Sequence, residues 1–153
     1  MSFADEWARE SQRAIQAQKE IVKVISISLF SGVIVSSPVG NPSLWKSPSS
    51  APAGYTGGSF RSNWFLSYEA ASSESTESTT RGNTLASDIA KEIESGNYKG
   101  AYQLTNNSPQ GPRLESGNWS KQAPNGIIAP NVMRVNSKIP AIEKIVNKKY
   151  GVN

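Results

Sequence analysis

The sequence predicts an α+β fold in which a small antiparallel β-sheet of about four strands packs against a long N-terminal helix and a C-terminal helix, with long extended loops. Three observations favour this class. A long helical segment opens the chain, short segments rich in β-branched and aromatic residues follow, and an amphipathic segment closes it. A chain of 153 residues has the size of one ordinary domain, so residues 1–153 are expected to form a single domain.

The first predicted element is a helix over residues 3–20, because Ser2 can cap it and neither Gly nor Pro interrupts it. The next segment, residues 22–35, is dense in β-branched residues and would also suit a strand. We favour a continuous helix, because the apolar residues of this segment can share one broad helical face. The helix should end by Ser37, since the following Pro38 disfavours helical backbone in the residue before it.

Residues 37–58 form an extended arm that is rich in Pro, Gly and Ser. Its large apolar side chains are few, namely Leu44, Trp45 and Tyr55. Sparse anchors of this kind dock either on the core of their own chain or on a neighbouring subunit, and the sequence leaves both alternatives open.

Alternating apolar residues predict a strand over residues 60–71, after the flexible Gly57-Gly58 pair. The Ser/Thr/Glu-rich run at 72–80 is expected to be a flexible surface loop. The remaining predicted elements are a short helix at 84–95, strands at 100–105 and 126–135, the second interrupted at Pro130, and a helix at 140–150.

A long polar loop, residues 106–126, is dense in Asn, Pro and Gly and carries Leu114 and Trp119 as apolar anchors. Loops of this length inside a compact domain are usually functional or disordered, and the two anchors favour an ordered loop that holds a partner. The alternative is that Trp119 only fills the base of its own loop. Within it, Arg113 and Glu115 are expected to form an ion pair that fixes the loop or contacts a partner.

The composition argues against most enzyme classes. The chain contains no histidine and no cysteine, which excludes Ser-His-Asp and Cys-His catalysis, Cys/His zinc sites and disulfides. Gly57-Gly58 lacks the Gly-Lys-Ser/Thr signature of a phosphate-binding loop. We therefore expect no catalytic residue, cofactor or metal, and a cell-wall-degrading enzyme that uses Glu115 stays as the last-ranked alternative.

The net charge of +4 is concentrated near the end of the chain, where residues 134–149 carry five basic side chains against one acidic one. Such a helix can attract nucleic acid or an acidic protein surface, or simply complement the helix dipole. Residues 21–35 are too short and too polar to span a membrane, and the charged first ten residues do not resemble a signal peptide. Assembly in the host cytoplasm, without membrane contact, is the expectation.

Two patches of sequence carry a family resemblance. The first is Ser37-Pro38-Val39 at the end of the helix, followed by Gly57-Gly58-Ser59-Phe60-Arg61-Ser62-Asn63-Trp64. The second is Asn106-Asn107-Ser108-Pro109, Leu114-Glu115-Ser116-Gly117 and Ser120-Lys121-Gln122-Ala123-Pro124-Asn125-Gly126. Together they resemble the tail-completion (head–tail joining, or neck) proteins of long-tailed bacteriophages over most of residues 20–135. The chain departs from that pattern at Gln110, where tyrosine is usual, and at Ser116, where an aromatic residue is common.

The resemblance implies a non-enzymatic structural protein of the virion that joins the tail to the head. Members of the family form a ring, commonly sixfold, and contact the tail terminator or tail tube and the head-completion or connector proteins. DNA passes through the lumen of the ring. The alternatives are a tail terminator protein that caps the tail tube and a nucleic-acid-binding module that uses the basic C-terminal helix.

Residues of the two long segments are the candidates for subunit or neck contacts in such a ring. They are Trp45, Tyr55, Arg113, Leu114, Glu115, Trp119 and Gln122. Arg61 is the candidate for a residue that faces the DNA in the lumen, with a structural pairing to a strand neighbour as its alternative.

Overall fold

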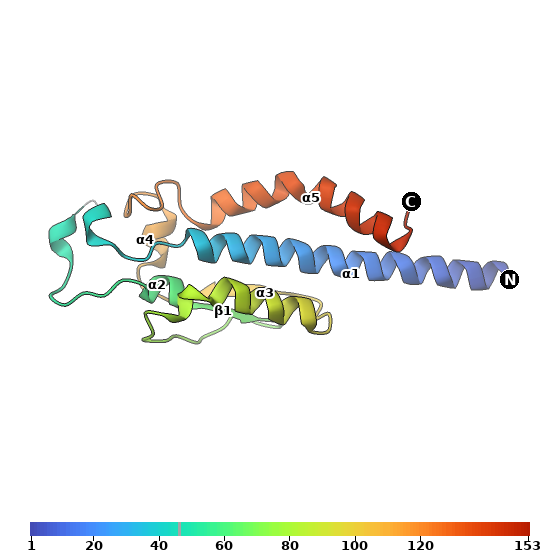
Figure 1. Ribbon diagram of the computed structural model, residues 1–153, viewed down its shortest axis with the longest axis horizontal. Coiled ribbons are helices and arrows are strands. Elements are labelled where there is room, and N and C mark those ends of the chain that lie inside the picture. The colour runs from blue at the N-terminus through green and yellow to red at the C-terminus, as the bar shows by residue number, and fades with distance from the viewer. Residues whose placement is uncertain (46) are drawn as a thin grey trace.

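The computed structural model describes residues 1–45 and 47–153, so Lys46, in the predicted arm, lies outside the described residues. Helices dominate the fold, and a small antiparallel sheet accompanies them, which confirms the predicted α+β class (Figure 1). The elements are α1 (Phe3–Ser36), η1 (Pro42–Leu44), η2 (Pro48–Ser50), α2 (Ser59–Ser62), β1 (Trp64–Ser67), η3 (Arg81–Asn83), α3 (Leu85–Ser95), β2 (Gln103–Asn106), α4 (Gly111–Glu115) and α5 (Ile128–Tyr150).

The first helix, α1, is continuous over 34 residues, which confirms the predicted helix over 22–35. A capping box starts it, in which the Ser2 hydroxyl accepts from the Asp5 N–H and the Asp5 carboxylate accepts from the Ser2 N–H, both at 3.2 Å. It ends as predicted, because Ser37 before Pro38 adopts extended backbone.

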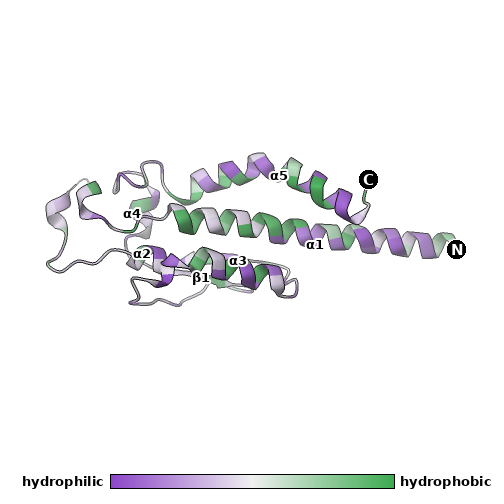
Figure 2. Cartoon of the chain, in the orientation of Figure 1, coloured by the Kyte–Doolittle hydropathy of each residue, from purple (hydrophilic) through white to green (hydrophobic). Residues whose placement is uncertain are grey.

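The middle of α1 is sandwiched between two layers (Figure 1). On one side it packs against α3, and on the other α5 runs alongside it. The arrangement explains why the sequence of α1 is apolar on several faces here, since both sides are covered. Hydrophobic residues accordingly dominate the C-terminal half of α1, and its first turns are largely hydrophilic (Figure 2).

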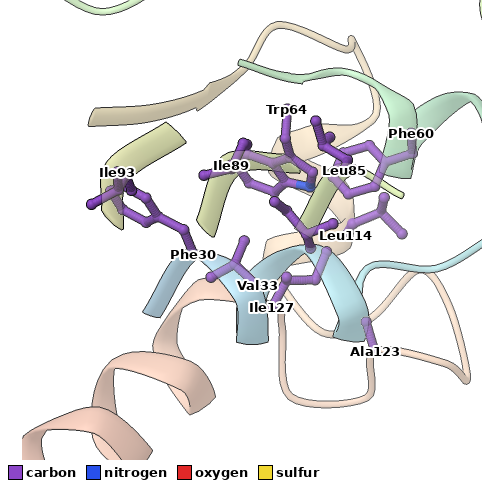
Figure 3. Close-up of a cluster of buried hydrophobic side chains, with 11 residues drawn as sticks. Phe30, Val33, Phe60, Trp64, Leu85, Ile89, Ile93, Leu114, Ala123 and Ile127 are labelled. Carbon is purple, nitrogen blue, oxygen red and sulfur yellow. The ribbon is translucent and has the colours of Figure 1, made fainter. Parts of the chain in front are cut away.

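Two hydrophobic clusters hold the layers together. The main cluster joins α1, α2, β1, α3, α4 and the loop before α5. Its buried members are Phe30, Val33, Ile34, Phe60, Trp64, Leu85, Ile89, Ile93, Leu114, Ala123 and Ile127 (Figure 3). The smaller cluster joins α1 to the end of α5 through Ala17, Ile21 and Val146. The helix predicted over 84–95 is therefore confirmed as α3, with the predicted apolar face buried.

The sheet has two strands among the described residues, fewer than predicted. β1 and β2 pair antiparallel, with Trp64 opposite Asn106 and Ser67 opposite Gln103. The strand predicted from residue 60 begins only at Trp64, because Gly58 (φ 107°) turns the chain into the short helix α2. The predicted loop at 72–80 is irregular, as expected.

The prediction of a strand over 126–135 is wrong, since α5 begins at Ile128. Pro130 lies in the first turn of this helix, where a missing N–H costs no hydrogen bond. The helix also continues through Pro140, which was expected to start a separate helix. α5 bends near its middle, as a proline inside a helix requires (Figure 1).

Candidate functional site

The two long segments, residues 37–58 and 106–126, lie at the same end of the molecule (Figure 1). We call them the arms. The Lys121 N–H donates to the Leu44 carbonyl at 3.1 Å, and the Val39 N–H donates to the Gln122 side-chain oxygen at 3.2 Å. Trp45 forms an isolated bridge with Ser120. The arms therefore dock on each other within one chain, and contact of the first arm with a neighbouring subunit stays a prediction.

An aromatic cluster forms where the arms meet. The rings of Trp45 and Tyr55 pack edge to face with centroids 5.1 Å apart, and the Arg113 guanidinium lies 5.0 Å from the Trp119 ring centre. Tyr55 is 38% exposed and Trp119 is 39% exposed. Burial raises the pKa of the Tyr55 hydroxyl from its ordinary value.

A pocket of about 160 Å³ opens within this cluster. Its lining is largely apolar and includes Val39, Trp45, Tyr55, Phe60, Leu114 and Trp119. Of the arm residues predicted from the sequence, Trp45, Tyr55, Leu114 and Trp119 line this cavity, whereas Arg113, Glu115 and Gln122 do not. That the two arms share one cavity could not be predicted from the sequence. We call this surface the arm pocket.

Glu115 caps helix α5. Its carboxylate accepts the backbone N–H groups of Ile127, Ile128 and Ala129 at 2.8, 2.8 and 3.0 Å. Burial alone would raise the pKa of this carboxyl, but the three N–H hydrogen bonds outweigh burial and lower the pKa below its ordinary value. The expected ion pair with Arg113 is wrong for the described residues, because Glu115 binds the helix N-terminus and Arg113 stacks on Trp119.

Leu114 and Gln122 also serve their own chain. Leu114 is only 4% exposed and belongs to the main core, yet it also lines the arm pocket, so its contact with a partner stays a prediction. Gln122 is used in the hydrogen bond that joins the arms. Trp45, Tyr55, Arg113 and Trp119 also stay as candidates for contact with a partner.

Arg61 caps the C-terminus of α1. Its guanidinium donates to the carbonyls of Val35 at 2.8 Å and Ser37 at 2.8 and 3.0 Å. Burial lowers the pKa of this guanidinium. Neither of the roles predicted for Arg61 describes this arrangement, since these partners lie at a helix end, whose free carbonyls favour a cation.

The sequence patches that carry the family resemblance meet in space. Trp64 donates its indole N–H to the buried Ser37 hydroxyl at 2.8 Å, so the two halves of the first patch are joined. In the second patch, Gly117 (φ 78°) and Gly126 (φ 86°) allow two backbone segments to approach closely. A Cβ at either position would lie 2.6 Å from a backbone oxygen. These residues were conspicuous in the sequence, but only the structure explains why those types are needed.

The basic residues near the end of the chain divide into two groups. Arg134 donates to the Ser28 carbonyl at 2.8 Å, and Lys149 lies 2.6 Å from the Glu20 carboxylate. Both therefore join α5 to α1. Lys138, Lys144 and Lys148 are exposed on α5.

A second exposed aromatic surface lies at the start of α1. Phe3 and Trp7 are 82% and 68% exposed, respectively. Neither residue was among the candidate contact residues predicted from the sequence.

Comparisons of the chain with protein-family models, with curated proteins and with solved structures found no significant match. In the described part of the chain, no group of three or more acidic side chains could hold a metal ion. None of the described helices is long and apolar enough to cross a membrane.

Proposed function

We propose that this protein is a structural component of a bacteriophage virion that joins the tail to the head, assembled as a ring at the head–tail interface. The observation that carries the proposal is the contact between the two sequence patches of the family resemblance, where the Val39 N–H donates to the Gln122 side chain next to the arm pocket. The virion neck would be its location, after assembly in the host cytoplasm.

The chemistry of the arm surface supports a role in protein contact. Trp, Tyr and Arg are the residue types that dominate binding energy at interfaces, and four such side chains surround or border the arm pocket. Hydrogen bonds between the arms hold these side chains in place before any partner binds, which lowers the entropy cost of association. The partners proposed are other copies in the ring, the tail terminator or tail tube, and the head-completion or connector proteins.

A deletion of the gene in its phage tests the proposal directly. Electron microscopy of the lysate should show filled heads and finished tails that lie unjoined, and the wild-type gene supplied in trans should restore joined particles. Tails of uncontrolled length would favour the alternative, a tail terminator protein. Normal infectious particles would contradict both.

A second candidate function, nucleic-acid binding, is favoured by one observation. Lys138, Lys144 and Lys148 are exposed on α5 and are not used to join it to α1. Such a surface would bind the DNA backbone without sequence preference, with an affinity that falls steeply with salt. Titration of the purified protein with duplex DNA at two salt concentrations separates this function from a purely structural one.

A further inference from the structure

The start of α1 carries an apolar stripe that is largely exposed, although residues 151–153 line a hollow beside Trp7. α5 covers one face of α1 near Ala17 and Ile21, and α1 then projects beyond the end of α5 (Figure 1). Phe3 and Ile21 are separated by a whole number of helical turns, as are Trp7 and Ile25. The exposed aromatics therefore continue the same face that α5 buries further along.

The arm pocket lies at the opposite end of α1, a helix about 50 Å long. Its 160 Å³ is several times the volume of about 30 Å³ that one water occupies in the liquid. The pocket can therefore receive a side chain but not a whole helix. One aromatic side chain presented from a helix fits both the size and the apolar lining.

The charges around the two surfaces are complementary. The first turns of α1 carry Asp5, Glu6 and Glu10 against Arg9. The arm that borders the pocket carries Arg113 and Lys121, while its acidic residue, Glu115, is occupied by the N-terminus of α5. An acidic helix start would thus approach a basic rim, which favours this pairing over the contact of two helix starts.

We propose that the first turns of α1 from one copy of this chain dock on the arm pocket of the next copy, with Trp7 as the inserted side chain. This inference rests on the proposed ring and names the interface that would close it. A contact between two different surfaces can only close as a ring or continue as a filament. The two surfaces lie at opposite ends of the molecule, so a chain cannot satisfy its own pocket.

Cross-linking between two single-cysteine variants tests the proposal, because the natural chain has no cysteine. Ala8→Cys lies next to Trp7, and Val39→Cys lines the arm pocket, where Val39 is partly exposed. A short bismaleimide should link the two variants when they are mixed and should link neither variant to itself. Self-linking of Ala8→Cys would instead demonstrate contact between two helix starts and overturn the proposal.

Self-association provides the second measurement. Trp7→Ala should weaken it about thirtyfold or more, as expected for loss of an interfacial tryptophan. Ile145→Ala is the matched control, since Ile145 is a similarly exposed apolar residue (70%) on the outer side of α5, and it should leave association unchanged. Equal association of wild type and Trp7→Ala would overturn the proposal.

The cross-linking experiment and the gene deletion can fail independently of each other. If the deletion gives unjoined heads and tails but the mixed variants do not cross-link, the joining function stands and this interface is wrong. A wild-type protein that stays monomeric at every concentration likewise contradicts the interface. If the mixed variants cross-link but the gene deletion leaves normal infectious phage, the interface stands and the joining function is wrong.

Discussion

The two ends of α1 expose aromatic side chains in different ways. At the Ser37 end, the aromatics belong to arms that are fixed by hydrogen bonds from several segments. At the other end, Phe3 and Trp7 project from the first turns of the helix and are largely exposed, with residues 151–153 beside Trp7. The arm aromatics are part of the tertiary structure, whereas Phe3 and Trp7 are not. Only substitutions of the arm aromatics should therefore lower the stability of the monomer.

Leu114→Ala should have the largest effect on stability. It removes a buried side chain that joins the second arm to the main core, and such truncations cost about 2–5 kcal/mol of unfolding free energy. Urea denaturation measures the loss. A change below 1 kcal/mol would mean that the arms are not part of the cooperative framework.

Glu115→Ala should cost about 2 kcal/mol, because three backbone N–H groups at the start of α5 lose a charged acceptor. Thermal unfolding should show a melting temperature lower by about 4–8 °C. Glu77→Ala is the control, since Glu77 lies in the irregular loop and no hydrogen bond of its carboxylate is recorded in the described structure; it should change little.

The same carboxylate should make stability depend on acid pH. The folded-state pKa of Glu115 lies below its unfolded value, so its contribution is complete above the unfolded pKa of about 4.5. That contribution is lost as pH falls through the lower folded pKa. Denaturation at pH 7 and at pH 3 should show that Glu115→Gln loses less stability on acidification than the wild type. Equal losses in both proteins would rule out a linkage at this residue.

Arg61→Ala should cost about 1–2 kcal/mol, because the carbonyls at the end of α1 lose a charged donor. Arg61→Lys should restore only part of it, since an ammonium cannot reproduce the forked geometry of the guanidinium. If Arg61 instead faced solvent, both variants would have wild-type stability in urea.

Trp7→Ala should have the smallest effect, within about 0.5 kcal/mol of wild type for the monomer. Its side chain contacts mainly solvent, so the unfolding free energy at low protein concentration should not change. A loss of unfolding free energy as large as that of Leu114→Ala would mean that Trp7 is as much a part of the tertiary structure as the arms are.

Local signals in the sequence predicted the elements that depend on local interactions. α1 has its own cap and its own proline stop, and α3 has a regular apolar face, so both were predicted. The start of α5 was missed because Glu115, the group that satisfies its N-terminus, comes from another segment. Without that cap, the β-branched residues around Pro130 favoured a strand.

The sequence predicted which aromatic residues belong to the candidate site, but it did not predict how the residues of the site are arranged. The aromatic residues of the arms were identified because they are rare in polar sequence. The roles of Arg61 and Glu115 were not, because nothing near either residue indicates that its partners are the ends of two helices. In the sequence, Arg61 and Glu115 suggested contacts with other molecules, but in the structure both side chains cap helix ends of their own chain.

Because α1 is continuous, its length determines the direction in which Trp7 points about the helix axis. Each residue advances a helix by about 100°, so the number of residues between Trp7 and Ala17 sets the direction in which Trp7 points relative to the rest of the molecule. Inserting one alanine between them would turn Trp7 by more than a quarter of a revolution, whereas inserting seven would return it nearly to its original direction at a greater distance. The length of the helix therefore sets the angular phase between its two ends.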